Sequence, residues 1–174
     1  IIQFGLDKWH ETIATKEYKS VLFFKNHGPM SGGSIRHPHS QIIGLRNYDY
    51  HEDITVKNMN GWLLHEDQDI LITLSKHPII GFFEYNLRYK PDAPVRSIAM
   101  RLQQTIRYVL DSLAKFSQSY NYFFYQLEDG YEYIKVIPRY ITTPLYVGYK
   151  IPQTCNDERA AKILRNITPY FELK

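Results

Sequence analysis

The feature that most restricts the fold is a hairpin signature near residue 130. Asp129-Gly130 separates two aromatic and β-branched runs, Tyr120–Leu127 and Tyr131–Ile137. An Asp-Gly turn between such runs favours a tight antiparallel hairpin, and so short a connection excludes a parallel crossover. A second pair of runs, Trp62–His65 and Ile70–Ser75, is joined by an acidic turn. The chain therefore has to build antiparallel sheet.

Helical periodicity and further strand-like runs complete the expected architecture. Apolar residues recur at helical spacing in two segments, and Asn156 is suited to cap a third helix. The expected helices are Ile1–Thr15, Val95–Ser117 and a last one from Asn156 to about Arg165. The further expected strands are Ser20–Lys25, His37–Leu45 and Ile79–Arg88. Asn26–Arg36 is expected to be a loop, and Asp49–Gly61 is polar and turn-rich. This order predicts the α+β class.

Composition and charge narrow the kinds of partner. The net charge is only +3 and the basic residues are spread along the chain, so a small anion fits better than nucleic acid. Cys155 is the single cysteine, which excludes an internal disulfide and favours a cytoplasmic setting. No apolar run is long enough for a membrane span. The chain opens without Met in a helix-like segment, so we expect an N-terminal part to be missing.

The chemistry is concentrated between Asn26 and Gln41. Side chains two residues apart share a face of a strand, so His37, His39 and Gln41 are expected to project together. The preceding Ser31–Ser34 segment lacks bulky side chains, and its amides are suited to form an anion nest. Imidazole is a competent nucleophile toward phosphorus near neutral pH. The segment therefore predicts a phosphate site beside a nucleophile.

Each half of this pattern also has a simpler explanation. A His-x-His pair on a strand is more often structural or exposed than reactive, and a glycine-rich loop is usually only a turn. Their combination, with Asn26 upstream and Gln41 on the histidine face, favours function over both simpler explanations.

The spacing of these residues resembles a known family. Asn-x-Gly, small residues, Gly-x-Ser and His-Pro-His-x-Gln, within Ser20–Leu45, resemble the active-site segment of galactose-1-phosphate uridylyltransferases of the histidine-triad superfamily. A weaker resemblance continues to the C-terminus through Ile137-Pro138-Arg139. The family resemblance implies a histidine-triad-like antiparallel sheet with packed helices, which would be the remnant of a two-lobed arrangement. Residues 1–90 would belong to the first lobe and residues 91–174 to a second, degenerate lobe.

The resemblance implies roles for individual residues. His39 corresponds to the histidine that carries a nucleotide, Gln41 to a glutamine that hydrogen-bonds the phosphate, and His37 to a histidine that binds zinc in many members. The expected nucleotide and phosphate contacts are Asn26, Gly32, Gly33 and Ser34. The family's reaction moves a nucleoside monophosphate from a sugar nucleotide, here a UDP- or ADP-sugar, to a sugar 1-phosphate, and its members are commonly homodimers.

Two features depart from the family pattern. The family's other zinc ligands, usually a CxxC and a further His before this segment, are not in the chain, so His37 is either an orphan ligand or a partner of the nucleophile. Tyr131 and Tyr133 stand where some members keep a second His-x-His, so no second metal is expected.

Other polar residues give weaker signals. His27 and Arg36 could assist phosphate binding or be solvated, and Arg139 is expected to pair with a carboxylate rather than bind a sugar phosphate. His51 with its acidic neighbours, and His65 with Glu66, could hold a metal, but solvated turns explain them better.

Three functions stay open at this stage. Nucleotidyl transfer is the leading one. A nucleotide hydrolase or phosphorylase would use the same His39 intermediate and resolve it with water or inorganic phosphate. The third is a degenerate, non-catalytic nucleotide-binding protein, against which the complete His-Pro-His-x-Gln motif argues.

Overall fold

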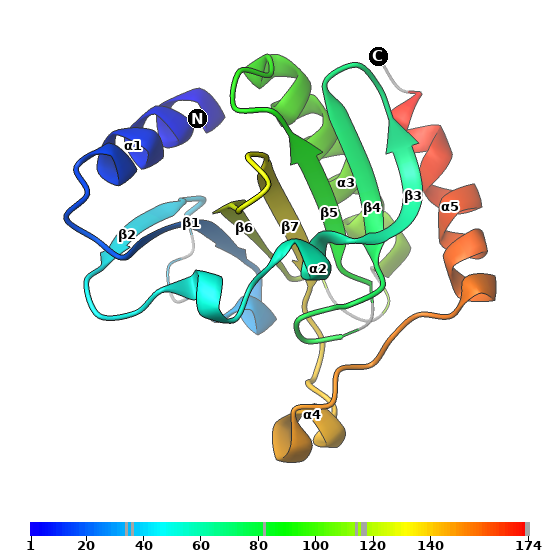
Figure 1. The fold of residues 1–174 in the computed structure, drawn as a ribbon. Coiled ribbons are helices and arrows are strands. Elements are labelled where there is room, and N and C mark those ends of the chain that lie inside the picture. Colours follow the sequence, from blue (N-terminus) through cyan, green and yellow to red (C-terminus); the bar gives the residue numbers. More distant parts are fainter. Residues whose placement is uncertain (34, 36, 82, 114, 116–117, 173–174) are drawn as a thin grey trace.

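The computed structural model describes residues 1–33, 35, 37–81, 83–113, 115 and 118–172. Seven strands form one sheet in the order β2-β1-β6-β7-β5-β4-β3, and every neighbouring pair is antiparallel (Figure 1). The strands are β1 Ser20–His27, β2 Gln41–Leu45, β3 Gly61–Glu66, β4 Ile70–Ser75, β5 Tyr85–Tyr89, β6 Tyr120–Gln126 and β7 Glu132–Pro138. The helices are α1 Ile2–Ala14, α2 Val56–Met59, α3 Val95–Leu113, α4 Pro144–Tyr149 and α5 Asp157–Phe171, with 3-10 turns η1 Pro29–Ser31 and η2 Tyr50–Glu52. The predicted α+β class with an antiparallel sheet is confirmed.

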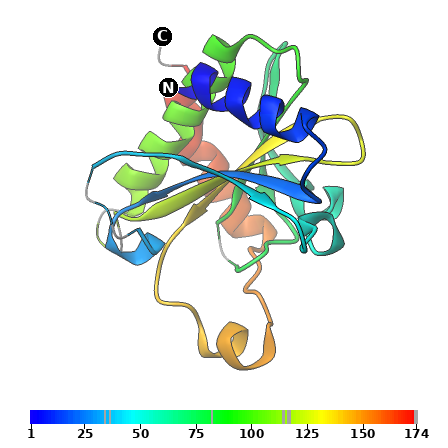
Figure 2. The same cartoon turned by 90° about the vertical axis from the view of Figure 1, so that its left-hand side faces the viewer.

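Helices α1, α3 and α5 cover one face of the sheet (Figure 2). Trp9 of α1 and Ile167 of α5 are fully buried, and Ile98 of α3 is nearly so. Burying a large apolar side chain stabilises a fold by about 1.5–3 kcal/mol. Trp9 also donates its indole N–H to the Val21 carbonyl at 2.9 Å, so α1 is held to β1 by a polar contact as well.

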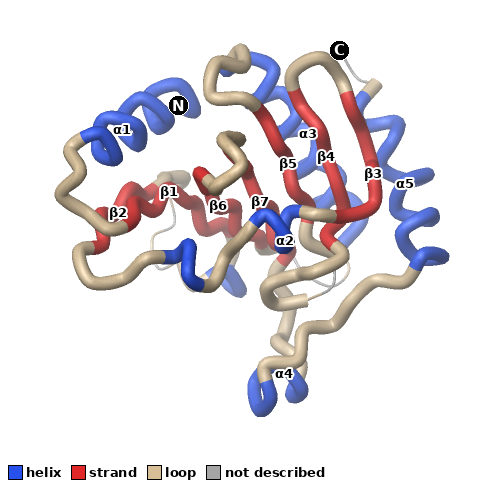
Figure 3. Tube along the Cα trace, in the orientation of Figure 1, coloured by secondary structure: helices blue, strands red, loops and turns tan. Residues whose placement is uncertain are grey.

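The opposite face is covered by the connection from β2 to β3, which contains η2 and α2 (Figure 3). Its Tyr50 and Met59 are buried against a second apolar cluster formed with Tyr125, Leu127 and Tyr133. The sequence predicted a polar, turn-rich segment at Asp49–Gly61, which contains the 3-10 turn η2. It did not predict α2, because so short a helix shows no periodicity, although Thr55 forms a capping box with Asn58.

The three predicted helices are present with changed ends. Helix α3 ends at Leu113, and residues 114, 116 and 117 of its predicted end lie outside the described residues. Helix α5 runs on to Phe171, and Asn156 accepts the Arg159 amide at 2.9 Å as the predicted cap. None of the helices in the described part of the chain is long and apolar enough to cross a membrane.

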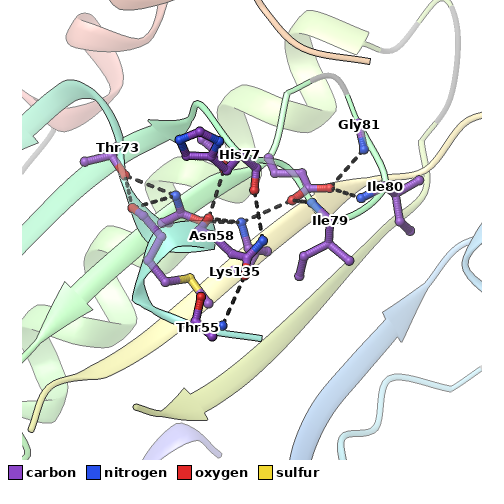
Figure 4. Close-up of polar contacts among 12 residues, drawn as sticks. Thr55, Asn58, Thr73, His77, Ile79, Ile80, Gly81 and Lys135 are labelled. Carbon is purple, nitrogen blue, oxygen red and sulfur yellow. Dashed lines mark hydrogen bonds and ion pairs between the residues drawn. The ribbon is translucent and has the colours of Figure 1, made fainter. Parts of the chain in front are cut away.

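A buried ion pair lies beside α2 (Figure 4). Lys135 and Glu84 are both fully buried, with Nζ and Oε2 3.1 Å apart. Lys135 also donates to Asn86 Oδ1 at 2.6 Å and to the Asn58 carbonyl at 2.9 Å. Glu84 accepts the amides of residues 79–81 at 2.7–3.1 Å. Buried charges need such partners, and these bonds turn residues 79–81 out of the sheet, so the predicted strand Ile79–Arg88 begins only at Tyr85.

The predicted strand His37–Leu45 is also too long. Strand β2 begins at Gln41, and residues 37–40 form no ladder with β1. Pro38 has no N–H to give to a ladder, so the pairing with β1 does not extend through it. The argument that His37, His39 and Gln41 share a face of one strand therefore fails for the two histidines.

Residues 139–156 form an arm that carries α4 away from the sheet (Figure 1). None of the α4 residues is buried, and Ile141, Val147 and Tyr149 are 84 %, 63 % and 75 % exposed. The sequence analysis did not predict α4, because a helix without a buried face needs no apolar stripe.

Candidate functional site

His37 and His39 lie next to each other just before β2, with ring centroids 5.5 Å apart. His39 Nδ1 is 3.0 Å from the His37 carbonyl oxygen. A carbonyl oxygen can only accept a hydrogen bond, so Nδ1 carries the proton and the neutral ring keeps its lone pair on Nε2. The half-buried His39 ring is thus held in the tautomer that a nucleophile acting through Nε2 needs.

The described part of the glycine-rich turn, Ser31–Gly33, packs against the end of β1. Gly32 has a φ of 80°, a left-handed conformation that glycine adopts readily. A Cβ on Gly33 would lie 3.2 Å from the Asn26 Cβ, so a larger residue there would press on β1. The Gly33 amide makes only a long bond, 3.4 Å, to Ser31 Oγ and is therefore weakly engaged. Ser34 lies outside the described residues.

Asn26 is oriented by a residue that the sequence analysis did not single out. Asn121 of β6 pairs with Asn26 of β1, and Asn121 is 2 % exposed. Its Nδ2 donates to Asn26 Oδ1 at 2.6 Å and to the Ser31 carbonyl at 3.0 Å, while its Oδ1 accepts from Arg139 at 2.8 Å. Asn26 Oδ1 is therefore occupied, and the Asn26 Nδ2 group is left to donate to a ligand. Arg139 bonds this amide in place of the predicted carboxylate.

Lys25 was also not predicted as a site residue. Its Nζ donates to the His39 carbonyl at 3.3 Å. Burial lowers the pKa of the Lys25 ammonium below its usual range. Burial, and then the Lys25 charge, lower the pKa of His27, whose ring stacks on Tyr120 at 4.7 Å. Nearby, Ser40 Oγ lies 3.2 Å from the Tyr122 hydroxyl, which ties the last residue before β2 to β6.

Two pockets flank this segment. One, of about 460 Å³, is lined by the glycine-rich turn and His37. The other, of about 330 Å³, is lined by apolar side chains of α3 and by His39. Lys25 and Pro38 line both. The volumes are in the range of small-molecule sites, and the segment His37-Pro38-His39, the HPH segment, contributes to the lining of both pockets.

The other candidate histidines have structural partners. His51 Nδ1 is 2.5 Å from Asp49, and its Nε2 is 2.9 Å from the Gln126 carbonyl. His65 bonds Asp67 at 3.2 Å and packs on the C-terminal helix. Within the described residues, no three His, Cys, Asp or Glu side chains are grouped to hold a metal ion, so His37 and His39 have no third ligand beside them there. Arg36 lies outside that part of the chain.

Comparison with known proteins places the chain in a family. The models of a domain of unknown function, DUF4931, match it in two parts, the N-terminal domain over residues 1–48 and the C-terminal domain over residues 51–171. A crystal structure of a DUF4931 family protein from Bacillus cereus is 37 % identical, with a TM-score of 0.85 over 99 % of this chain and 78 % of that one. The chain belongs to the DUF4931 family.

This DUF4931 protein shares its fold with uridylyltransferases at low identity. A GalT-like protein from Arabidopsis thaliana is 14 % identical, with a TM-score of 0.71 over 95 % of this chain and 67 % of that one. A uridylyltransferase structure is 15 % identical, with a TM-score of 0.73 over 97 % and 68 % of the two chains. No curated protein sequence matches the chain. These similarities show a nucleotidyltransferase-like fold.

Proposed function

We propose that this DUF4931 protein is a nucleotidyltransferase that moves a nucleoside monophosphate between a sugar nucleotide and a sugar 1-phosphate through a nucleotidyl-His39 intermediate. The observation that carries the proposal is the bond from His39 Nδ1 to the His37 carbonyl, which in the neutral ring places the lone pair on Nε2. The fold shared with uridylyltransferases supports the same reaction class. The proposed donor is a UDP- or ADP-sugar.

In the first step, His39 Nε2 attacks the α-phosphorus of the donor. The P–N bond forms while the bond from phosphorus to the bridging oxygen breaks, and the sugar 1-phosphate leaves with that electron pair. The ring becomes positive, and its Nδ1–H bond to the His37 carbonyl stabilises the charge. In the second step, an oxygen of the acceptor sugar 1-phosphate attacks phosphorus, and the P–N electron pair returns to Nε2.

The other predicted residues are proposed to hold the nucleotide. Their donors are the Asn26 and Gln41 amides, the backbone of Gly32 and Gly33, and the Ser34 hydroxyl. Charge accumulates on the phosphate oxygens in the transition state, where fixed donors stabilise it. The orientation that Asn121 gives Asn26 supports this assignment.

Two further expectations stay proposals. A zinc ion on His37 would need ligands from outside the described residues. A homodimer is expected for this fold type, and self-association in solution would test it. A hydrolase or phosphorylase differs only in what resolves the intermediate, and a degenerate nucleotide-binding protein would form no intermediate.

Intact-mass measurement after incubation with UDP-sugars and ADP-sugars tests the proposal. We expect the full chain to gain one nucleoside monophosphate and His39→Asn to gain none. His77→Asn, at an exposed histidine remote from the segment, is the matched control and should label like the unmodified protein. Labelling of His39→Asn, or no labelling with any donor, would overturn the proposal. Chasing the adduct with sugar 1-phosphate, inorganic phosphate or water separates transferase, phosphorylase and hydrolase.

A further inference from the structure

Lys25 is a partly buried cation that has no counter-ion among the residues the structure describes. No ion pair within the described residues includes it, and the His39 carbonyl is its one hydrogen-bond acceptor there. An ammonium group has three N–H donors, so two of them are not used by the described protein groups. An anion from outside the chain would stabilise a cation that is partly desolvated in this way.

The surroundings of Lys25 are free of acidic groups. Neither of the two pockets that it lines has a carboxylate among its described lining residues, although the chain contains 18 Asp and Glu. Their titratable residues besides Lys25 include the histidines His27, His37 and His39 and the tyrosines Tyr120 and Tyr122. A third pocket, of about 350 Å³ beside β4 and β5, differs: its Arg88 and Lys90 lie among four acidic residues. The absence of acids around Lys25 is thus a local property that suits an anion.

Lys25 also lies at both pockets. It lines the pocket of the glycine-rich turn and the pocket that His39 lines, and its Nζ contacts the His39 carbonyl. A ligand that occupied both pockets would therefore lie beside Lys25.

We infer that Lys25 binds the second phosphate of a phosphoric anhydride substrate, the phosphate that leaves with the sugar when His39 is nucleotidylated. This inference rests on the proposed function and adds to it a residue that binds the departing phosphate. The ammonium offsets the negative charge that develops on the bridging oxygen and the departing phosphate.

Binding of inorganic pyrophosphate, measured by calorimetry at low salt, tests the site without any chemistry. We expect Lys25→Met to weaken binding about 10- to 100-fold, the loss of a charge-assisted hydrogen bond, and Lys25→Arg to stay within about threefold of the unmodified chain. Lys76→Met removes the same charge from an exposed position at the far side of the sheet and should bind normally. Failure of the unmodified chain to bind pyrophosphate, or equal binding by Lys25→Met, would overturn the inference.

Single-turnover labelling of His39 tests the role in the reaction. With a UDP- or ADP-sugar, Lys25→Met should slow labelling about 10- to 100-fold. With the nitrophenyl ester of UMP or AMP, which has no second phosphate, the effect should be under about threefold. Equal losses with both donor types would refute the assignment, since a merely structural role would affect them alike. If the unmodified chain labels with neither donor, the proposed function fails, and the pyrophosphate result still decides whether Lys25 is an anion site.

Discussion

At the scale of single residues, the site depends on side chains that orient other side chains. Asn121 never lies in the predicted motif, yet it fixes Asn26, the carbonyl of Ser31 and Arg139 in one arrangement. A ligand-binding amide is useful only if its oxygen and nitrogen ends are not interchangeable. The bond from Asn121 to Asn26 Oδ1 selects one of the two orientations.

Replacing Asn121 should therefore harm both stability and labelling. Asn121→Ala leaves buried acceptors at Asn26 and Ser31 and a donor at Arg139 without their partner, and we expect a loss of about 1–3 kcal/mol in the free energy of unfolding. Urea denaturation measures it. Asn47→Ala, at an exposed turn position, should change stability by less than about 0.5 kcal/mol. Equal stabilities for the two variants would contradict the role given to Asn121.

At the scale of elements, α1 is attached to the sheet by a hydrogen-bonded pair of titratable side chains, His10 and Glu132. His10 Nε2 lies 2.6 Å from Oε1 of Glu132 in β7, and Glu132 is 1 % exposed. The Gln126 amide donates to the same oxygen at 3.0 Å. The hydrogen bond to Glu132 raises the pKa of His10 above its ordinary value of 6.5, against the effect of burial and with help from the charges of Glu132 and Asp7.

This pair predicts a pH-dependent attachment of α1. A group whose pKa is raised by folding contributes stability fully below its unfolded pKa, and the contribution is lost as pH rises through the folded pKa. The stability difference between the unmodified chain and His10→Gln should thus be largest near about pH 5.5 and shrink toward about pH 8.5. Denaturant unfolding at the two pH values measures it, with His77→Gln as control. A difference that does not change with pH would count against the pair.

Longer elements with a buried face were predictable from sequence, and short or exposed ones were not. The hairpins β3–β4 and β6–β7 and the helix α3 follow from apolar periodicity and turn chemistry. Helices α2 and α4 are too short or too exposed to show a period. The start of β5 depends on Glu84 accepting three backbone amides, a contact within a turn that no periodicity indicates.

The candidate site was predictable only as a motif. The sequence brings the HPH segment and the glycine-rich turn together because they are neighbours in the chain. Asn121 and Tyr122 reach the same place from β6 through strand pairing, which local spacing does not encode. Lys25 was not predicted because no sequence pattern marks a lone lysine in a strand. It stands out only in the structure, where no described residue pairs with it as a counter-ion.

At the scale of the whole molecule, one sheet joins the two regions that the family models treat as separate domains. Strand β1 pairs with β6, and Phe23 stacks on Phe124 with centroids 4.2 Å apart. Residues 1–48 thus supply β1 and β2 to a sheet whose other strands come from residues 51–171. The candidate site lies at the boundary between the two regions, since Asn26 belongs to the first region and Asn121 to the second.

We therefore expect the two regions to depend on each other for folding. Residues 51–174 expressed alone would expose the β6 edge and the apolar surface under α1, and should aggregate. Coexpression with residues 1–48 should yield a soluble complex by size-exclusion chromatography, with Phe23→Asp in the short fragment as a control that cannot bind. A soluble, monomeric 51–174 fragment that unfolds cooperatively would show that this region folds without β1 and β2.

The strand order also fixes a sequence of events during synthesis. The β1–β2 hairpin leaves the ribosome early, but its partner β6 is translated about 95 residues later, as the Asn26–Asn121 contact measures. Until β6 is translated, β1 has no strand partner on the side away from β2. The segment that carries His39 is thus encoded well before the strand that completes its surroundings, so a nascent chain that stalls before Asn121 carries His39 without the Asn26–Asn121 amide pair.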